Sequence, residues 1–595
     1  MAYLHNMNTH YTVERNAQII LFLLKEYGIK RVIASPGTTN ITIIASMQQD
    51  SFFEMYSAAD ERSAAYMACG LAAETGEPVV LSCTGATASR NYLPGLTEAF
   101  YRKLPILAIT SHQGQANIGN HIAQVLDRGV VPNDVAIYST YIRSVRGKDD
   151  EWEAETKANK ALIALTTKGN GPVHVNLETL FGKDFTAINL PKSHFVKYIN
   201  YKSEYPPLPN GKIIVFIGSH LPFEENTERI IEKFCDENNA VVFCDHTSNY
   251  KGNHRFLHAL LGHQKNTNCS VVDDVELVIH LGEISGDTYT TKLLKRACQT
   301  WRISEDGVYR DTFRNLSYIF EIDEYNFFDK YVKNNGLINN SFLNDCQQKY
   351  NELVKIIPDS IPFSNIWIAS VLASKLPEKS EIHFGIFNSL RSWNLFEIPK
   401  SVREFCNVGG FGIDGGVSSL VGASLANNNK LYFGVFGDLA FFYDLNSIAN
   451  RHRGNNIRIL LINNGKGTEF RNYHHLGARF GEDADEYIAA AGHYGNKSKA
   501  LIKHYSEDLG FKYLSASNKT EFLENCDEFT NPNISQAILF EVFTDSRDES
   551  NALYIIDHLI EDNSKKEEIT TKIKKIAKSV LGENATSIVK TIIKK

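Results

Sequence analysis

The sequence predicts an α/β protein made of three Rossmann-like or flavodoxin-like domains with mainly parallel sheets. Three observations lead to this prediction. The chain has 595 residues, more than one hydrophobic core supports. Short apolar runs of strand length alternate with longer segments of helical pattern. Glycine or another turn residue commonly follows an apolar run. The predicted parts are a first domain at 1–190, a middle domain at 191–355, a third domain at 356–555 and a Lys-rich helical tail at 556–595.

In the first domain, predicted strands and helices alternate along the chain. The strands are expected at 31–35, 52–58, 78–83, 105–110 and 171–177. The helices are expected at 13–27, 60–74 and 89–101. Because strands joined by helical crossovers run parallel, we expect one mainly parallel sheet with helices on both faces.

The middle domain follows a polar, proline-containing linker at 191–211. Its predicted strands lie at 212–218, 240–244, 275–281 and 316–322, with a helix at 226–238. Gly218 follows the first of these strands and is a weak indication of a phosphate contact, since one glycine is not a fingerprint. A structural spacer is the simpler interpretation of this domain.

The third domain carries polar side chains where two apolar runs end. Asp438 follows the run 431–436, and Asn464 follows the run 457–462. Ends of neighbouring parallel strands meet at one edge of a sheet, so these oxygens are expected to converge. Mg²⁺ prefers oxygen ligands and commonly bridges to phosphate. An ordinary βαβ unit with capping Asp and Asn gives the same short pattern, so this spacing alone leaves both interpretations open.

Composition limits the remaining classes. The chain is 43% hydrophobic and 22% charged with a net charge of −7, which fits a soluble globular protein without general affinity for nucleic acid. Nine cysteines occur without a C-x-x-C pair, which favours reduced thiols in a cytoplasmic protein. The N-terminal residues lack an apolar signal core, and the run Ile19 to Leu24 is too short to span a bilayer. We therefore expect no membrane partner.

The stretch from Gly437 to Phe470, which begins GDLAFFYDLN and ends INNGKGTEF, resembles the cofactor-binding motif of thiamine diphosphate-dependent enzymes. Leu439 stands where that family usually has glycine, and this feature is similar to the menaquinone-pathway (MenD-like) synthases. The segments SPGTTN, DERSAAYMACGLA and CTGATASRNYLPGLTEAF follow the order seen in the family's pyrimidine-binding domain. The resemblance implies a pyrimidine-binding first domain and a diphosphate- and magnesium-binding third domain.

In the first domain, the resemblance assigns Glu61 to the aminopyrimidine ring, where it would share a proton with the ring nitrogen. A helix N-terminal acid stabilised by the helix dipole is the ordinary alternative. Gly37 and Gly85 would contact the cofactor. Gln124 would face the reacting centre, or it is a surface amide on a loop. His121, on the same loop, is more simply explained as solvated.

In the third domain, the resemblance implies that Asp438 and Asn464 bind Mg²⁺ through side-chain oxygens and Lys466 through its backbone carbonyl. Ile413 would be the apolar wedge that bends the cofactor. Glu469 stands where MenD-like enzymes have an apolar residue, and a catalytic role and simple exposure remain equally open. The other implied cofactor contacts are Ser389, Gly412, Gly437, Leu439 and Phe470. The roles of His474 and His475 stay unassigned.

The resemblance implies an enzyme that decarboxylates a 2-oxo acid and transfers the acyl carbanion to an acceptor carbonyl. Several arginines that bind 2-oxoglutarate and isochorismate in MenD-like enzymes are missing, for example after Ser35-Pro36-Gly37, where Thr38-Thr39 follow. The sequence therefore predicts the same cofactors with a different substrate. Alternatives are a simple 2-oxo acid decarboxylase, an acetolactate-synthase-like enzyme with FAD (which lacks a visible fingerprint here), and a silent scaffold subunit.

The assembly is a further implication of the resemblance. In the family the first and third domains of different subunits meet at the active site. We therefore expect a homodimer, or a homotetramer built as a dimer of dimers, with two equivalent sites per dimer.

Overall fold

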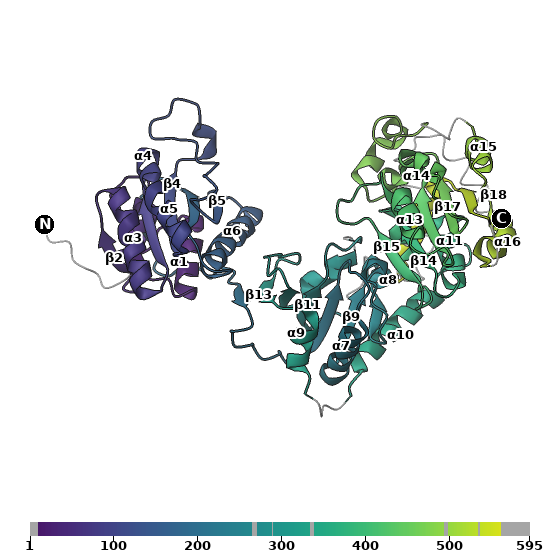
Figure 1. Cartoon of the computed structure of the whole chain (residues 1–595), viewed down its shortest axis with the longest axis horizontal. Helices are drawn as coiled ribbons and strands as arrows, with labels where there is room; N and C mark the ends of the chain where they lie inside the picture. Colours follow the sequence, from purple (N-terminus) through teal and green to yellow (C-terminus); the bar gives the residue numbers. More distant parts are fainter. Residues whose placement is uncertain are drawn as a thin grey trace. The chain divides into compact units, whose positions relative to one another are not determined.

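The structure, a computed structural model, describes residues 10–264, 271–287, 290–333, 338–492, 498–532 and 536–560. The chain divides into two compact units (Figure 1). Unit 1 contains 1–200 with 308–319, and unit 2 contains 201–307 with 320–595. Beyond residue 560, the predicted Lys-rich tail lies outside the described residues. The domain boundaries inferred from the sequence remain predictions.

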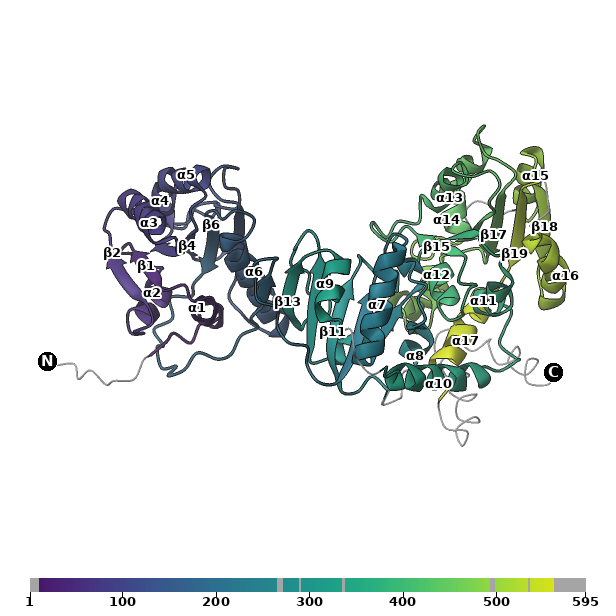
Figure 2. The ribbon, with the colours of Figure 1, turned by 60° about the horizontal axis from the view of Figure 1, so that its bottom comes forward.

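The first sheet is parallel, with strand order β2-β1-β3-β4-β6-β5. Its strands are β1 (Arg31–Ala34), β2 (Glu54–Ser57), β3 (Val79–Cys83), β4 (Ile106–His112), β5 (Tyr138–Ile142) and β6 (Val173–Glu178). Its helices are α1 (Arg15–Glu26), α2 (Ile41–Met47), α3 (Glu61–Thr75), α4 (Ala86–Asn91), α5 (Leu93–Arg102) and α6 (Lys148–Thr166). Figure 2 shows α1, α2 and α6 on one face of this sheet and α3, α4 and α5 on the other.

Two local differences from the sequence prediction have physical reasons. The single helix expected at 89–101 is two helices, α4 and α5, because Pro94 occupies the first turn of α5, where a missing N–H costs nothing. Strand β5 was not predicted, because its residues YSTYI mix polar and apolar side chains and are mostly half-buried. Both segments still belong to the α/β layer predicted for this part of the chain.

The middle sheet has the strand order β10-β9-β8-β11-β12-β13-β7. Its strands are β7 (Lys197–Ile199), β8 (Lys212–Ile217), β9 (Ala240–Cys244), β10 (Arg255–Leu257), β11 (Val275–Leu281), β12 (Gln299–Ser304) and β13 (Leu316–Glu321). The accompanying helices are α7 (Glu225–Asn238), α8 (Ala259–His263), α9 (Glu324–Tyr331) and α10 (Ser341–Lys355). The described pairings among β8, β9, β10, β11 and β12 are parallel.

The third sheet is also parallel, with strand order β15-β14-β16-β17-β19-β18. Its strands are β14 (Glu381–Phe384), β15 (Arg403–Cys406), β16 (Tyr432–Gly437), β17 (Ile457–Asn463), β18 (Lys512–Ala516) and β19 (Ile538–Phe543). Its helices are α11 (Asn365–Leu372), α12 (Asn388–Trp393), α13 (Gly416–Ser424), α14 (Asp438–Tyr443), α15 (Leu501–Asp508), α16 (Lys519–Thr530) and α17 (Ser546–Asp557). The predicted α/β fold with mainly parallel sheets is confirmed.

The first and third sheets have the same topology. When the six strands of each sheet are numbered along the chain, their order across the sheet is 2-1-3-4-6-5. The direction of winding reverses between the first and third strands of each set, which are β1 and β3 in one sheet and β14 and β16 in the other. Loops at the carboxyl ends of such strand pairs diverge and leave a crevice. The strand order alone therefore predicts one ligand site at the carboxyl edge of each of these two sheets.

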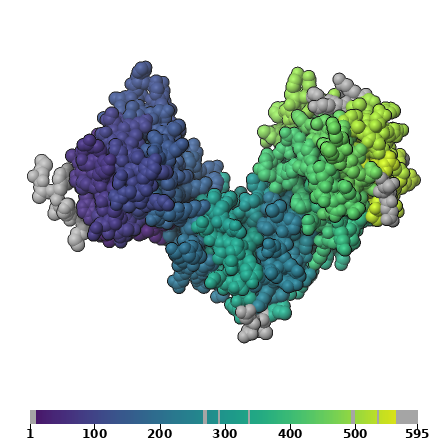
Figure 3. All heavy atoms as spheres, in the orientation of Figure 1, coloured from purple at the N-terminus to yellow at the C-terminus, as the bar shows by residue number. Residues whose placement is uncertain are grey.

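Within unit 2, the middle and third sheets are joined through buried polar contacts. The backbone N–H of His246 donates to Asn394 Oδ1 (3.1 Å), and His246 Nε2 lies 3.0 Å from the carbonyl of Trp393. Lys251 and Glu404 form an ion pair across the same boundary. Figure 3 shows these two parts of unit 2, teal and green, with their surfaces in contact.

Two expectations about the chain's environment can be compared with the described residues. The eight cysteines among them carry free thiols. Over the same residues, no helix is both long and apolar enough to cross a membrane.

Candidate functional site

In unit 1, the glycines predicted to contact cofactor lie in the loops after β1 and β3, on either side of the winding reversal. A Cβ on Gly37 would lie 2.4 Å from the Cβ of Thr84, so no larger residue fits there. A Cβ on Gly85 would lie 3.1 Å from the backbone oxygen of Gln124. The two loops and the segment at Gln124 therefore form one closely packed group.

Glu61 is the first residue of α3, directly after β2. The preceding Asp60 caps this helix by accepting a hydrogen bond from the Arg62 backbone N–H (3.2 Å). The Glu61 side chain is half-buried, and its Oε2 accepts a hydrogen bond from the Asn91 amide (3.5 Å). One carboxylate thus faces the edge of the first sheet that the sequence assigned to the pyrimidine ring. Its catalytic role stays a prediction.

Gln124 and His121 are both exposed, and both have positive φ, 64° and 54°. For Gln124 it is the backbone oxygen that lies against Gly85. Its predicted role at the reacting centre therefore remains a prediction. A residue that sequence reasoning missed is Arg128, which is buried beneath this loop and donates to the Ser111 carbonyl and to Asn176 Oδ1, each at 2.7 Å.

In unit 2, Asp438 and Asn464 lie at the carboxyl ends of the adjacent strands β16 and β17, where Gly437 is in register with Ile462. Helix α14 begins at Asp438 itself, and a 3₁₀ turn over Leu445–Ala449 follows it. Gly437 has open space where a Cβ would lie, so ligand atoms can approach this turn.

The Asp438 carboxylate is buried, and this burial raises its pKa to about 7. Backbone N–H groups, including those of Leu439 and Gly465, hydrogen-bond it and oppose the rise, whereas the charge of Glu541 adds to it. The Gly465 contact shows that Asp438 meets the turn that carries Asn464. No ion pair to Asp438 occurs among the described residues. A buried carboxylate in this position fits a divalent cation, which would favour its charged form.

The remaining predicted metal ligand is the backbone carbonyl of Lys466. Its backbone N–H donates to Asn464 Oδ1 (3.4 Å), and its Nζ is 2.6 Å from Asp485 Oδ2, so the side chain is engaged elsewhere. Among the described residues, no group of three or more His, Cys, Asp or Glu side chains is placed to hold a metal. A magnesium site here would therefore consist of one carboxylate, one amide and one carbonyl oxygen, as predicted.

The loops after β14 and β15 complete this edge. Ser389 is buried in α12, and Ile413 is half-buried in the glycine-containing loop that precedes α13. Phe387 and Phe411, which sequence reasoning missed, have φ of 65° and 53° and ring centroids 6.0 Å apart. Left-handed backbone at such residues costs on the order of 1–3 kcal/mol each and concentrates at ligand sites. No sequence pattern signals this strain in phenylalanine.

Glu469 does not stand free at the site. Its Oε1 lies 2.6 Å from Nη1 of Arg391, and both side chains are about one-fifth exposed. With its amide oriented toward the carboxylate, Asn388 donates to Glu469 Oε2 (2.9 Å) and accepts from the Glu469 backbone N–H (3.2 Å). Glu469 therefore binds the N-terminal turn of α12 from the loop after β17. The alternative of an exposed carboxylate is wrong, and a catalytic role is still untested.

The last predicted contacts surround this pair. Leu439 and Phe470 are half-buried, and Phe470 packs edge-on against His475 with ring centroids 5.2 Å apart. A Cβ on Gly467 would lie 3.0 Å from the Phe470 ring, so the turn after Asn464 is closely packed. These placements leave the predicted cofactor roles compatible with the structure.

Comparisons with known proteins show what this chain is similar to. Residues 15–130 match the family described as "Thiamine pyrophosphate enzyme, N-terminal TPP binding domain". The 2-succinyl-5-enolpyruvyl-6-hydroxy-3-cyclohexene-1-carboxylate synthase of Bacteroides thetaiotaomicron is 29% identical over 570 residues, covering 91% of this chain and 98% of the relative. The synthase of the same name from Flavobacterium psychrophilum is 28% identical over 571 residues, covering 89% and 96%.

The fold, the site and these similarities together define a thiamine diphosphate-dependent enzyme. The chain is similar to the MenD-like synthases over most of its length. The recognition made from the cofactor motif is thus confirmed.

Proposed function

We propose that this chain is a thiamine diphosphate- and Mg²⁺-dependent carboligase, which decarboxylates a 2-oxo acid and transfers the acyl unit to an acceptor carbonyl. The observation that carries the cofactor part is the convergence of Asp438 with the turn at Asn464 and Gly465 at one sheet edge. The reaction class is supported by the relatives, whose names describe a synthase.

The proposed metal ligands belong to unit 2, and the proposed proton-transfer residue Glu61 belongs to unit 1. Asp438, Asn464 and the Lys466 carbonyl would hold Mg²⁺, and the open turn at Gly437 would admit a diphosphate. When bound, thiamine diphosphate supplies a nucleophilic carbon and an electron sink for loss of CO₂. Glu61 would hold a proton on its carboxyl group at the pyrimidine ring. Of the proposed metal ligands, the Asp438 side chain is buried.

The substrate is proposed to differ from that of the MenD-like enzymes. The resemblance implies that those enzymes bind a dicarboxylic donor through arginines. Here Arg391, near the predicted cofactor contact Ser389, already binds the Glu469 carboxylate at 2.6 Å. An internal carboxylate thus occupies the cation that a substrate's second carboxylate would need. We therefore favour a donor with a single carboxylate, such as pyruvate.

A simple decarboxylase that releases an aldehyde is the second candidate, because the same residues serve both reactions up to loss of CO₂. An acetolactate-synthase-like enzyme with FAD is less well supported, since acidic side chains in the cleft of the middle sheet, among them Glu283, Glu305 and Asp323, outnumber basic ones and repel a diphosphate.

The active assembly is proposed to be at least a homodimer, in which Glu61 of one copy serves the Asp438 site of the other. Symmetric pairing gives each dimer two equivalent sites. Light scattering of the purified chain with both cofactors tests this assembly directly, and a monomer that is fully active would contradict it.

The reaction itself is tested by CO₂ release from pyruvate, 2-oxoglutarate and branched 2-oxo acids, with thiamine diphosphate and Mg²⁺. Glu61→Gln should lower this release by about 10²- to 10⁴-fold, the usual effect of removing a proton-transfer group. Glu74→Gln, an exposed position on the same helix α3, is the matched control and should retain activity. Release that survives in Glu61→Gln would refute the mechanism. Product analysis with added aldehydes separates ligase from decarboxylase.

A further inference from the structure

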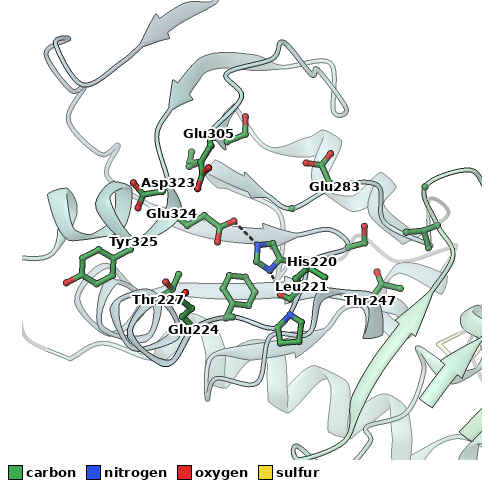
Figure 4. Close-up of a pocket in the computed structure, with 18 of the residues that line it drawn as sticks. His220, Leu221, Glu224, Thr227, Thr247, Glu283, Glu305, Asp323, Glu324 and Tyr325 are labelled. Atoms are coloured by element: carbon green, nitrogen blue, oxygen red, sulfur yellow. Dashed lines mark hydrogen bonds and ion pairs between the residues drawn. The ribbon is translucent and has the colours of Figure 1, made fainter. Parts of the chain in front are cut away.

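Unit 2 contains a cavity of about 890 Å³ at the carboxyl edge of the middle sheet, apart from the Asp438 edge of the third sheet. Its walls are the loops after β8, β9, β11, β12 and β13 together with the end of β15. The volume lies in the range, about 300–1,000 Å³, of pockets that take small organic ligands. Figure 4 shows the labelled side chains from these loops around one hollow.

The position of the cavity follows from the winding of the sheet. In the order β10-β9-β8-β11-β12, the direction of chain progression reverses between β8 and β11. Residues directly after these two strands, Ser219 and His220 on one side and Gly282 and Glu283 on the other, line the cavity. The first and third sheets place some of their predicted cofactor contacts at the corresponding reversal, Gly37 and Gly85 in the first and Ser389 and Asp438 in the third. The middle sheet therefore has a ligand site of its own by the same topological rule.

Among the charged side chains of the lining, carboxylates outnumber basic groups. Glu224, Glu283, Glu305, Asp323 and Glu324 face it, whereas its basic side chains are Arg302 and His220. Arg302 lies 3.4 Å from Glu283, so one charge of each sign is already paired.

His220 offsets one further carboxylate. Its Nε2 lies 3.3 Å from Glu324 Oε1. Burial alone lowers the pKa of His220, but the hydrogen bond to Glu324 and the charge of that carboxylate raise it above its ordinary value. Its ring stacks on Phe223 with centroids 4.0 Å apart. After both pairings, the cavity still carries an excess of negative charge beside an aromatic surface.

The two helices that begin at the cavity strengthen this charge preference. Helix N-termini ordinarily attract phosphate. At α9, however, Asp323 already accepts the backbone N–H of Asn326 (2.9 Å). At α7, the preceding Glu224 and the first-turn residues Glu225 and Glu228 are acidic. Both positions where a nucleotide phosphate would bind thus carry carboxylates.

We propose that this cavity binds a small organic cation with two or more amino groups. Ammonium groups would pair with the excess carboxylates, and the methylene segments between them would lie along the stacked rings of His220 and Phe223. Such a ligand would also contact Asn407 and Val408 at the start of the loop that carries Ile413, so it would lie against a segment of the proposed cofactor site.

The test uses the full-length chain loaded with thiamine diphosphate and excess MgCl₂, titrated with spermidine in a calorimeter. The excess Mg²⁺ saturates any site that accepts a simple divalent cation, so that such a site does not contribute to the spermidine signal. Wild type should bind one spermidine per chain, and the affinity should fall steeply with added salt. ADP, the anionic comparison ligand, should produce no binding heat.

The variant Glu224→Gln/Glu305→Gln removes two exposed carboxylates of the lining and should weaken spermidine binding by about tenfold. The control Glu352→Gln/Asp527→Asn removes the same net charge at surface positions outside the lining and should bind like wild type. Glu324→Gln provides an independent second variant with the same expected direction. Circular dichroism verifies that each variant is folded.

Three results would overturn the proposal. One is the absence of spermidine binding to wild type. The second is an equal loss in the lining and control variants, which would indicate non-specific attraction to an acidic protein. The third is binding of ADP in preference to spermidine. None of these outcomes depends on the proposed reaction, because no measurement requires turnover.

Discussion

The contact between Glu469 and Arg391 makes a specific prediction about donor choice. Glu469→Gln keeps the size of the side chain and its hydrogen bond to Asn388 but removes the charge that faces Arg391 at 2.6 Å. Arg391 is then left about one-fifth exposed without a carboxylate partner from Glu469. A donor with a second carboxylate should fill that position. We therefore expect the variant to gain preference for 2-oxoglutarate over pyruvate.

The size of the gain follows from the lost contact. A hydrogen bond to a charged group contributes about 1.5–3 kcal/mol. Part of that energy becomes available to the substrate, since the guanidinium of Arg391 is only partly exposed to water. At about 1.4 kcal/mol per factor of ten, the ratio of kcat/KM for 2-oxoglutarate to that for pyruvate should rise about tenfold. Most of the change should lie in KM, because the contact concerns binding of a remote group.

The assay is CO₂ release at varied donor concentration for wild type, Glu469→Gln and Arg391→Gln/Glu469→Gln. The double variant lacks the cation and should lose the gain. An unchanged donor ratio in Glu469→Gln would refute the reasoning, as would an equal gain in the double variant. Loss of turnover with every donor would instead show that Glu469 takes part in catalysis, which the sequence left open.

Four further predictions concern the Mg²⁺ site, the sharing of sites between subunits, the packing of Gly416 and the protonation of His174. Asp438→Asn should abolish Mg²⁺-dependent binding of thiamine diphosphate, measured by calorimetry, while the melting temperature without cofactor changes little. Mixing inactive Glu61→Gln with inactive Asp438→Asn should restore about a quarter of wild-type activity if subunits exchange randomly and share sites, and no recovery would exclude shared sites. Gly416→Ala should lower the free energy of unfolding by about 1–3 kcal/mol, because its Cβ would lie 2.8 Å from the Phe436 ring. His174 is buried, which lowers its pKa to about 3. The folded state thus resists protonation of His174, and its contribution to stability should fall by roughly 2 kcal/mol between pH 7 and pH 5, a slope that His174→Asn should lack in urea titrations.

The sequence predicted the three parallel sheets well because their central strands are continuous apolar runs. The strands expected at 240–244 and 275–281 coincide with β9 and β11. The edge strand β5 was missed because its pattern is mixed, whereas the edge strand β2 was predicted at 52–58. The interior strands β12 and β19 were also not predicted. The short β10 (Arg255–Leu257) gives too few residues for any periodicity.

For the site, backbone roles were predictable and side-chain pairings were not. Asp438 and Gly37 follow apolar runs, so strand ends alone place them at sheet edges. The pairing of Glu469 with Arg391 joins helix α12 to the segment after β17, 78 residues further along the chain. Nothing in the sequence near either residue favours that partner. The left-handed backbone of Phe387 is likewise imposed by packing, since phenylalanine has no intrinsic preference for it.

This division explains where the chain can change its chemistry. The proposed metal ligands lie at the ends of two adjacent strands and beside a glycine turn, so they should vary little if the cofactor is to be kept. Donor choice is proposed to depend on side chains such as Glu469, which contacts Arg391 from a separate segment of the chain. One substitution at Glu469 would alter a charge without moving a strand. A MenD-like enzyme with a different donor is therefore reached most directly by placing a carboxylate of its own on the arginine. The Glu469→Gln measurement tests this step because it removes that carboxylate alone.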